Sequence, residues 1–423
     1  MNQFPTNRLI ILFMASVSLF WIGCSPSQQG ATAADILGNP NKQAISYGGY
    51  RTTSRDTVPT VDQIKDDMRI LSAMGIKILR TYNTELAELP NLLEAITALK
   101  KEDSSFEMYV MMGAWINCKG AFTDSPDHTQ EDEAFNKADI ERAVQYAQQY
   151  PDIIKIIAVG NEAMVHWAAS YFVPPSVILK WVNYVQDLKA KGDLPEDLWV
   201  TSSDNFASWG GGDASYHNED LDSLIKAVDY ISVHTYPFHD THYNKKYWEA
   251  SQENTQNQTK LESIDDAMKR AKDYAISQYN SVKDYVTDLG INKPIHIGET
   301  GWATVSSGLY GSKGSQAADE YKQALYYNHM REWTSKNNIS CFFFEAFDEI
   351  WKDASNSQGS ENHFGLFTID GKAKYALWNS VDEGIFSGLT RDGNTIEKTF
   401  NGSEQNLLDS VLPPLILKTE INQ

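Results

Sequence analysis

The stretch Ile154-Lys-Ile-Ile-Ala-Val-Gly-Asn-Glu162 joins a β-branched run to a glycine and an acidic residue. A short run that is rich in isoleucine and valine predicts a buried β-strand. The same order of strand, glycine and glutamate returns in Ile295-His-Ile-Gly-Glu-Thr-Gly-Trp302. Both stretches therefore predict a strand that carries a glutamate at its carboxyl end.

Six further runs have a similar length and composition. The eight predicted strands are Gln43 to Gly48, Ile76 to Tyr82, Phe106 to Ala114, Ile154 to Gly160, Leu198 to Ser203, Tyr230 to Tyr236, Pro294 to Glu299 and Ser340 to Phe347. Stretches with apolar residues at helical spacing separate them, for example Val61 to Met74 and Ser315 to Thr334. Strand and helix alternating eight times predict an α/β fold closed into a (β/α)8 TIM barrel.

An open doubly wound sheet is the alternative to the barrel. After the first strand the sequence reads Gly48-Gly-Tyr-Arg-Thr-Thr53, which lacks the glycine-rich phosphate fingerprint of such sheets. The loops Trp115 to Ala134 and Pro237 to about Lys260 are long and follow the carboxyl ends of strands. Long loops at that rim shape the substrate clefts of barrels, so the pattern favours a barrel with a cleft.

Three segments of different character flank the barrel, which is expected over residues 43–381. Residues 1–23 have the pattern of an export signal, with Arg8 before the apolar run Leu9 to Ile22. The four residues that end at Cys24 resemble a bacterial lipoprotein box, in which this cysteine is lipidated; plain secretion and a retained membrane anchor are the alternatives. Residues 24–42 are expected to form a tether, and residues 382–423 a C-terminal tail of unknown role.

The sequence therefore predicts an exported bacterial lipoprotein at the periplasmic face, or at the outer membrane or cell surface, held to the membrane only by its lipid. A formal charge of −20 without a run of lysine and arginine argues against binding to nucleic acid. No His-Glu-x-x-His or paired-cysteine spacing occurs, so we expect no metal and no other cofactor. We expect a monomer.

Cys118 and Cys341 are predicted to remain unpaired, because they fall at opposite ends of their strands. A strand of about five residues spans roughly 16 Å. A disulfide tolerates at most about 7 Å between the two Cα atoms.

Glu162 and Glu299 are the candidate catalytic residues. A glutamate after a strand is often only a solvated loop residue, but here two follow parallel strands whose carboxyl ends meet at one barrel mouth. Two carboxyl groups at one mouth are what glycosidic cleavage needs. One of them, kept protonated, donates to the leaving oxygen, and the other attacks the anomeric carbon or activates water.

These motifs resemble those of glycoside hydrolase family 17, the β-1,3-glucanases and related glucanosyltransferases. Val159-Gly-Asn-Glu162 is similar to the family's acid/base motif and Gly298-Glu-Thr-Gly-Trp302 to its nucleophile motif. Phe344-Glu-Ala-Phe-Asp-Glu-Ile-Trp-Lys352, with His363-Phe-Gly-Leu-Phe367, looks like its eighth strand and closing loop. The resemblance runs in the right order through the predicted barrel.

The resemblance implies that Glu162 is the acid/base and Glu299 the nucleophile. Configuration is then retained, and the two carboxyl groups lie about 5 to 5.5 Å apart. Asn161 would bind the 2-hydroxyl of the sugar in the cleavage subsite. Arg80-Thr-Tyr82 matches a second-strand motif that places Tyr82 beside the nucleophile, with Arg80 in support.

The resemblance also implies that Glu349, Lys352 and Glu361 form a supporting network. A lysine close to a carboxylate lowers its pKa and keeps it ionised, which suits a nucleophile. An exposed i,i+3 ion pair is the alternative for Glu349 and Lys352.

Aromatic side chains supply flat surfaces on which the CH faces of sugar rings stack. Four are expected at the rim as substrate-binding residues, with core packing as the alternative for each: Tyr47, Tyr236, Trp302 and Trp351.

The resemblance implies a retaining, endo-acting hydrolase of β-1,3-glucan, with laminarin-like polysaccharide or its oligosaccharides as partner. A β-1,3-glucanosyltransferase with the same site is the nearest alternative. A non-catalytic, glycan-binding surface lipoprotein is an alternative of another class.

Overall fold

The computed structural model describes Met1, residues 30–250 and residues 258–416. From Thr32 onward these residues belong to one compact unit. The predicted export signal and the predicted lipidation at Cys24 lie outside the described residues. None of the helices in the described ranges is long and apolar enough to cross a membrane.

Eight parallel strands close into a barrel in the order β1-β10-β9-β8-β7-β6-β3-β2. They are β1 (Gln43–Ser46), β2 (Ile76–Arg80), β3 (Tyr109–Ala114), β6 (Ile154–Asn161), β7 (Trp199–Asn205), β8 (Ile231–His234), β9 (Ile295–Gly301) and β10 (Cys341–Phe344). Each strand overlaps one predicted run, so the predicted (β/α)8 barrel is confirmed. The strands read as apolar runs because helices cover the outer face of a parallel barrel.

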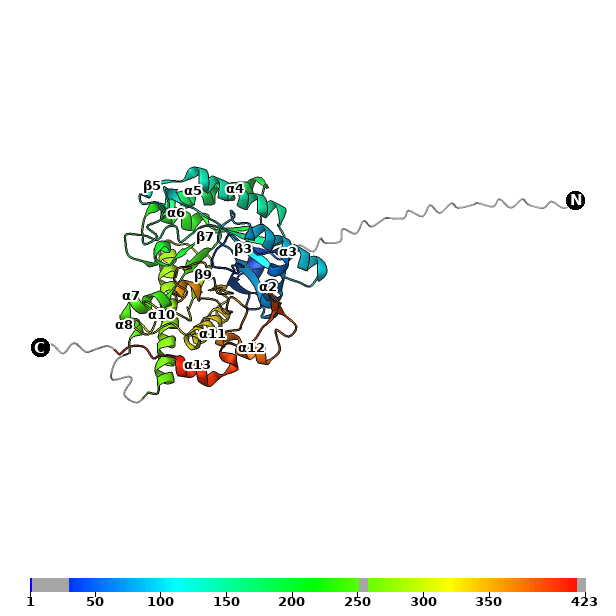
Figure 1. The fold of residues 1–423 in the computed structure, drawn as a ribbon. Helices are drawn as coiled ribbons and strands as arrows, with labels where there is room; N and C mark the ends of the chain where they lie inside the picture. The colour runs from blue at the N-terminus through cyan, green and yellow to red at the C-terminus, as the bar shows by residue number, and fades with distance from the viewer. Residues whose placement is uncertain (2–29, 251–257, 417–423) are drawn as a thin grey trace. The chain divides into compact units, whose positions relative to one another are not determined.

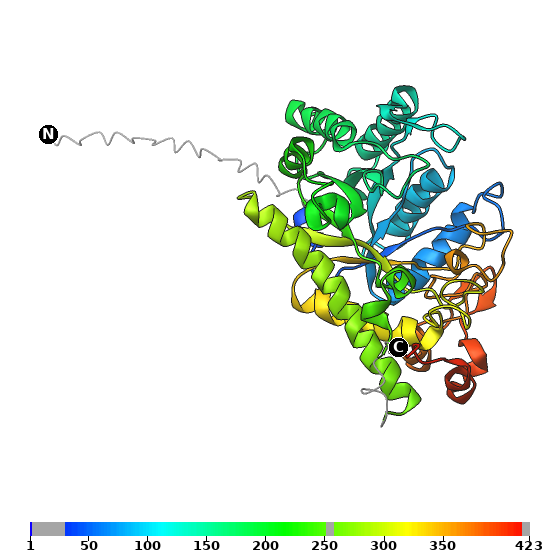
Figure 2. The same ribbon diagram turned by 90° about the vertical axis from the view of Figure 1, so that its left-hand side faces the viewer.

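A ring of helices surrounds the strands (Figure 1). Its main members are α2 (Val61–Ala73), α3 (Glu88–Glu102), α4 (Glu133–Gln149), α5 (Pro175–Lys191), α6 (Glu219–Ala227), α10 (Lys260–Asp288) and α11 (Glu320–Lys336). α11 begins five residues later than predicted, because the Asp319 side chain accepts the Lys322 N–H and caps the helix there. Figure 2 shows α10, the long yellow-green helix, along one side of the barrel.

The two long loops contain short elements of their own. The loop after β3 forms an antiparallel hairpin of β4 (Cys118–Lys119) and β5 (Asp127–Glu131). The loop after β8 contains α7 (Pro237–Tyr243) and α8 (Lys245–Trp248). Cys118 and Cys341 are both buried free thiols.

The tether expected over residues 24–42 is wrong from Thr32 onward. Thr32 caps the short helix α1 (Ala33–Ile36), in which Ala33 and Ile36 are fully buried. The Gly38 N–H donates to Ser340 Oγ over 2.8 Å, just before β10 begins. Residues 32–42 therefore pack against the amino-terminal end of the barrel.

The predicted C-terminal tail is folded up to residue 416. It begins at the last residue of α12 (Trp378–Asp382) and contains β11 (Thr390–Arg391), β12 (Asn394–Thr395) and α13 (Glu404–Ser410). The fully buried Arg391 donates from Nε to Asp67 Oδ1 in α2 over 3.0 Å, and its guanidinium lies 3.9 Å from the centre of the Phe347 ring. A buried charge is stable only when it is paired, so this contact joins residues 382–416 to the barrel.

Candidate active site

A cleft of about 1340 Å³ opens at the carboxyl ends of the barrel strands. Glu162 and Glu299, the two predicted catalytic residues, both line it. Eight of the other predicted site residues line the same cleft: Tyr47, Tyr82, Asn161, Tyr236, Glu349, Trp351, Lys352 and Glu361.

Both glutamates follow an irregularity in strand pairing. The register of β6 against β7 shifts by one residue between Ala158 and Asn161. The register of β9 against β8 shifts by one residue between Ile297 and Glu299. A bulge of this kind turns the side chains that follow it, and each shift contains the glycine of its motif.

The glycine before Glu299 is required by the polar interior of the barrel. A Cβ on Gly298 would lie 2.0 Å from Ser232 Oγ and 2.5 Å from Ser203 Oγ. These two hydroxyl oxygens are 2.8 Å apart, and Ser203 Oγ is also 2.8 Å from His234 Nε2. Any larger residue at position 298 would therefore displace the layer that supports His234.

Three donors hold the carboxylate of Glu299. Its Oε2 accepts from Arg80 Nη1 over 2.6 Å and from the Tyr82 hydroxyl over 2.8 Å, and its Oε1 accepts from the Tyr236 hydroxyl over 2.6 Å. Glu299 is 7% exposed and Arg80 only 1%. The side chain is thus fixed in one orientation with one carboxylate face toward the cleft.

The surroundings of Glu299 favour its ionised form. Burial on its own would raise the pKa of Glu299, but His234, which carries a positive charge only in acid, Arg80 and the two tyrosine hydroxyls outweigh it and lower the pKa to about 2. Burial lowers the pKa of His234 itself to about 4, so this imidazole is neutral near pH 7. Arg80 is therefore the permanent positive charge at Glu299.

Glu162 stands at the end of β6 in a constrained backbone conformation. Its φ is +46°, in the left-handed region that costs a non-glycine residue about 1–2 kcal/mol. The Glu162 N–H donates to the Ser203 carbonyl over 3.0 Å, and two residues later the Met164 N–H donates to Asp204 Oδ2 over 2.8 Å. These bonds to β7 hold the turn and offset the strain.

The surroundings of Glu162 favour its protonated form. Burial raises the pKa of Glu162 to about 8, with the negative charge of Glu299 adding to the effect. Glu162 Oε1 lies 3.1 Å from His234 Nδ1. The surroundings therefore shift the pKa values of the two carboxyl groups in opposite directions, toward the acid at Glu162 and toward the carboxylate at Glu299.

Arg80 connects the two motifs across the mouth. Its Nη1 also donates to the Gly298 carbonyl over 2.7 Å, and its Nη2 donates to Asn161 Oδ1. Because the amide oxygen of Asn161 is occupied by Arg80, its NH2 group is the part that can donate to a ligand.

Lys352 pairs with Glu349 in the cleft wall, as the resemblance implied, but it does not contact the nucleophile. Its Nζ lies 3.0 Å from Glu349 Oε2 and 3.7 Å from Glu345 Oε2, and the Glu349 and Glu345 side chains are nearly inaccessible. The expectation that a lysine keeps the nucleophile ionised is therefore wrong, because the cation that contacts Glu299 is Arg80. The alternative of an exposed i,i+3 pair is also wrong, since the pair is buried at the cleft wall.

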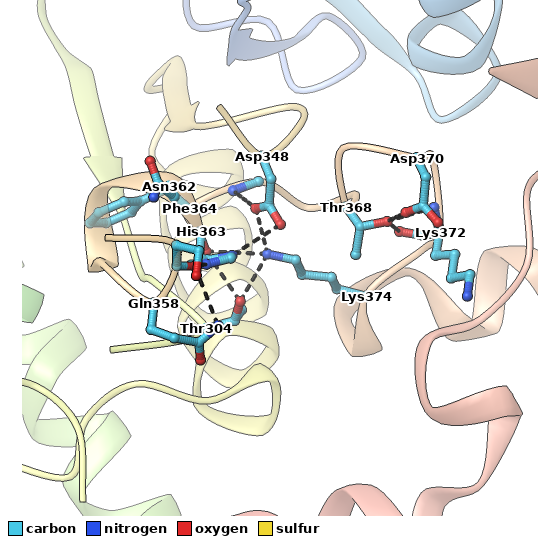
Figure 3. A network of polar contacts seen from close by, with 12 residues as sticks. Thr304, Asp348, Gln358, Asn362, His363, Phe364, Thr368, Asp370, Lys372 and Lys374 are labelled. Atoms are coloured by element: carbon cyan, nitrogen blue, oxygen red, sulfur yellow. Dashed lines mark hydrogen bonds and ion pairs between the residues drawn. The ribbon is translucent and has the colours of Figure 1, made fainter. Parts of the chain in front are cut away.

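Another buried ion pair joins the loops that follow β9 and β10 (Figure 3). Lys374 Nζ donates to Asp348 Oδ1 over 2.7 Å and to Thr304 Oγ1 over 2.8 Å. The Gly365 N–H donates to the same Asp348 oxygen over 3.0 Å. This network fixes the loop that brings Glu361 to the rim of the cleft.

Two of the predicted stacking residues are too buried to offer a ring face to a sugar. Trp302 is fully buried, packs against Phe238 and Trp248, and donates from Nε1 to the Ala317 carbonyl. Its expected role as a sugar platform is wrong, because alternation along β9 turns it outward under the helices. Tyr47 is 2% exposed and donates to Asp67, so it supports the cleft floor rather than offering a ring face.

Tyr236 and Trp351, the other two predicted stacking residues, line the cleft. Tyr236 lines it and acts on Glu299 through its hydroxyl. Trp351 lines it beneath the guanidinium of Arg55, which lies 4.2 Å from the ring centre. Whether either ring binds sugar stays a prediction.

His234 and Asp204 are site residues that the sequence interpretation missed. His234 contacts Glu162. Asp204 is fully buried near the end of β7 and accepts from the Met164 N–H, which fixes the turn that follows Glu162. A signal existed for both. His234 is two residues before Tyr236 and so shares its face of the strand, and Asp204 directly follows the fifth predicted strand.

A barrel whose mouth holds one glutamate in surroundings that favour its acid form and another in surroundings that favour its ionised form has the fold and site of a glycosidase. The BtgE/BtgC glycoside hydrolase domain matches residues 44–365. The chain belongs to this family, and the resemblance to β-1,3-glucanases and glucanosyltransferases is confirmed. It is a glycoside hydrolase.

Relatives agree with this assignment. The chain is 63% identical, with a TM-score of 0.90, to the crystal structure of an endo-laminarinase from Formosa, covering 93% of this chain and all of that one. It is 28% identical over 326 residues to a glucan 1,3-beta-glucosidase of Schizosaccharomyces pombe, covering 76% of this chain and 82% of the relative. A β-1,3-glucanosyltransferase of Rhizomucor miehei shares the fold, with 19% identity and a TM-score of 0.54 over 79% of this chain and 96% of that one.

Replacing Glu299 by Gln is expected to lower the pKa of Glu162 below about 8. The substitution removes the negative charge that opposes ionisation of Glu162 and leaves Arg80 without its main partner. Carbon NMR titration of labelled glutamate carboxyls measures the shift, with Glu332→Gln on the surface as control. An unchanged Glu162 titration in Glu299→Gln would show that the two carboxyl groups do not interact.

Proposed function

We propose that this protein hydrolyses β-1,3-glucan chains internally, with retention of configuration at the anomeric carbon. The observation that carries the proposal is that Glu162 and Glu299 line one cleft, with Glu299 ion-paired to Arg80. The high identity to a structure described as an endo-laminarinase supports the substrate and the internal cleavage. A non-catalytic glycan-binding role would not require this pair of carboxyl groups.

In the first step Glu162 donates its proton to the glycosidic oxygen while a Glu299 oxygen attacks the anomeric carbon. The carbon–oxygen bond to the leaving chain breaks, and a covalent glycosyl ester forms on Glu299. Glu162 is then a carboxylate and takes a proton from the incoming water. The water oxygen bonds to the anomeric carbon, the ester breaks, and both glutamates return to their starting states.

The neighbours of Glu299 position it for attack. Arg80, Tyr82 and Tyr236 occupy fixed directions around the carboxylate, so the attacking oxygen needs no reorientation. Their interaction weakens as the charge of Glu299 is lost in the ester, and it is restored when water releases the sugar. The NH2 group of Asn161 is placed to donate to the 2-hydroxyl of the sugar in the cleavage subsite, a contact that strengthens in the transition state.

Glu162→Ala and Glu299→Gln are each expected to lower kcat on laminarin by about 1000-fold or more, since each removes a group that acts directly on the bond. Glu332→Gln, on an exposed helix surface, is the matched control. Azide should restore turnover of a dinitrophenyl β-laminaribioside by Glu162→Ala, giving a β-glycosyl azide. An α-azide from this variant, or wild-type rates in Glu299→Gln, would contradict the two roles.

Analysis of wild-type products on laminari-oligosaccharides separates hydrolysis from transfer, because both proceed through the same ester. Products longer than the starting oligosaccharide as the main outcome would favour a glucanosyltransferase.

We also propose that the protein is exported and anchored by a lipid on Cys24. The support is the charged residue, the apolar run and the cysteine within residues 1–24. Labelled palmitate should enter the full-length protein made in a bacterial host and should be absent from Cys24→Ser, while Cys118→Ser keeps the label. Equal labelling of wild type and Cys24→Ser would contradict the anchor.

A further inference from the structure

Three aromatic side chains pack together at the wall of the cleft, on loops that carry neither Arg80 nor Glu299. Trp115 follows β3, Phe122 lies in the β4–β5 hairpin, and Tyr171 lies in the loop after β6. The rings of Phe122 and Tyr171 are stacked, with centres 5.4 Å apart, and those of Trp115 and Tyr171 are 5.2 Å apart. Trp115 and Phe122 line the cleft, with Tyr171 packed against both. We call these three residues the aromatic platform.

Hydrogen bonds fix the platform from both loops. The Phe122 N–H donates to the Ser170 carbonyl over 2.8 Å, and the Cys118 N–H donates to the Tyr171 carbonyl over 3.2 Å. The indole of Trp115 donates to Asn117 Oδ1 over 2.7 Å. The platform is therefore held in place by the backbone before any ligand binds.

Phe122 is not explained by a role in the core. Its side chain is 63% exposed, although it is a large apolar residue. Its φ is +59°, a left-handed conformation that is an outlier for a bulky side chain. Burial therefore does not offset the backbone strain, and strain of this kind accompanies binding sites.

The topology places the platform on the Glu162 side of the cleft. β3, which leads to Trp115, is the neighbour of β6 and lies four strands from β9 in either direction around the closed barrel. Glu162 ends β6, whereas Glu299 stands on β9. A general acid donates to the leaving oxygen, so the leaving part of the substrate lies on the side of Glu162.

We propose that the aromatic platform is a subsite for the leaving part of a glucan chain, where the CH face of a glucosyl ring stacks on Trp115 and Phe122. The inference rests on the proposed function, since it uses Glu162 as the acid. Sugar rings present apolar CH faces, and the platform offers apolar ring faces at the cleft wall. The same surface would bind an acceptor sugar after the first step, because an acceptor enters the part of the cleft that the leaving chain has vacated.

Phe122→Ala is expected to lower kcat/KM for laminarihexaose about five-fold, because the loss of one aromatic stacking contact changes a binding constant by a factor of about this size. It should leave kcat/KM unchanged for β-laminaribiosyl fluoride, whose leaving group is a single atom that cannot reach the platform. Phe122→Tyr, which keeps the ring, should retain the wild-type value for both substrates.

Phe400→Ala is the matched control. Phe400 is also a partly exposed phenylalanine with a φ of +51°, but it lies in the C-terminal segment and not along the cleft. It should leave both substrates unaffected. An unchanged rate on laminarihexaose in Phe122→Ala, or an equal loss on both substrates, would overturn the subsite. A wild-type protein that cleaves neither substrate would instead contradict the proposed function.

Discussion

The guanidinium of Arg80 is the contact on which the site depends. It is almost inaccessible to water, and it holds the Glu299 carboxylate, the Gly298 carbonyl and the Asn161 amide at once. A buried charge without a partner is strongly unfavourable. The buried Arg80 therefore requires an ionised Glu299, and the ionised Glu299 requires Arg80. One interaction therefore fixes both the geometry of β6 relative to β9 and the charge at the mouth.

The second constraint is the contrast between the two glutamates. Glu299 faces a cation and two hydroxyl donors, whereas Glu162 faces the neutral His234 and the negative charge of Glu299 itself. Burial would raise both pKa values, and only the partners separate them. The ionised Glu299 thus helps to keep the proton on Glu162, so the two roles are set jointly rather than residue by residue.

The backbone prepares this arrangement before the side chains act. Each glutamate follows a one-residue shift in strand register that contains a glycine. At Gly298 a side chain would collide with the hydroxyl groups of the barrel interior, whereas Gly160 has a φ of +81° and a side chain there would meet Ile178. The glycine in each motif is therefore required by the shift in strand register, in addition to the glutamate that the chemistry requires.

The eight strands could be predicted because each is a short apolar run between helical patterns, and a parallel barrel buries both faces of its strands. The carboxyl pair followed from its place at two strand ends. The sequence could not show which cation contacts Glu299, since Arg80 and Lys352 both belong to matching motifs and only the strand geometry separates them. The position of Trp302 was predicted wrongly for a related reason. At the end of a strand one face is exposed to the cleft and the other is buried under the helices, and Trp302 lies on the buried face.

The folded C-terminal segment escaped prediction because its decisive contact is long-range. Arg391 pairs with Asp67, which is more than three hundred positions earlier in the chain. The hairpin that carries Phe122 was missed because Asp127–Glu131 is polar throughout and has no alternating pattern. Local periodicity predicts strands and helices, but it does not predict contacts between distant polar residues.

The proposed mechanism requires that Glu299 forms a covalent bond to the sugar while Glu162 transfers the proton. A 2-deoxy-2-fluoro-β-laminaribiosyl fluoride tests it most directly, because the fluorine at C2 slows both steps while the fluoride leaving group still allows the first. The fluorosugar is expected to accumulate on the peptide that contains Glu299, as peptide mass spectrometry can show. A label on the peptide that contains Glu162, or turnover to the inverted product without any label, would contradict it.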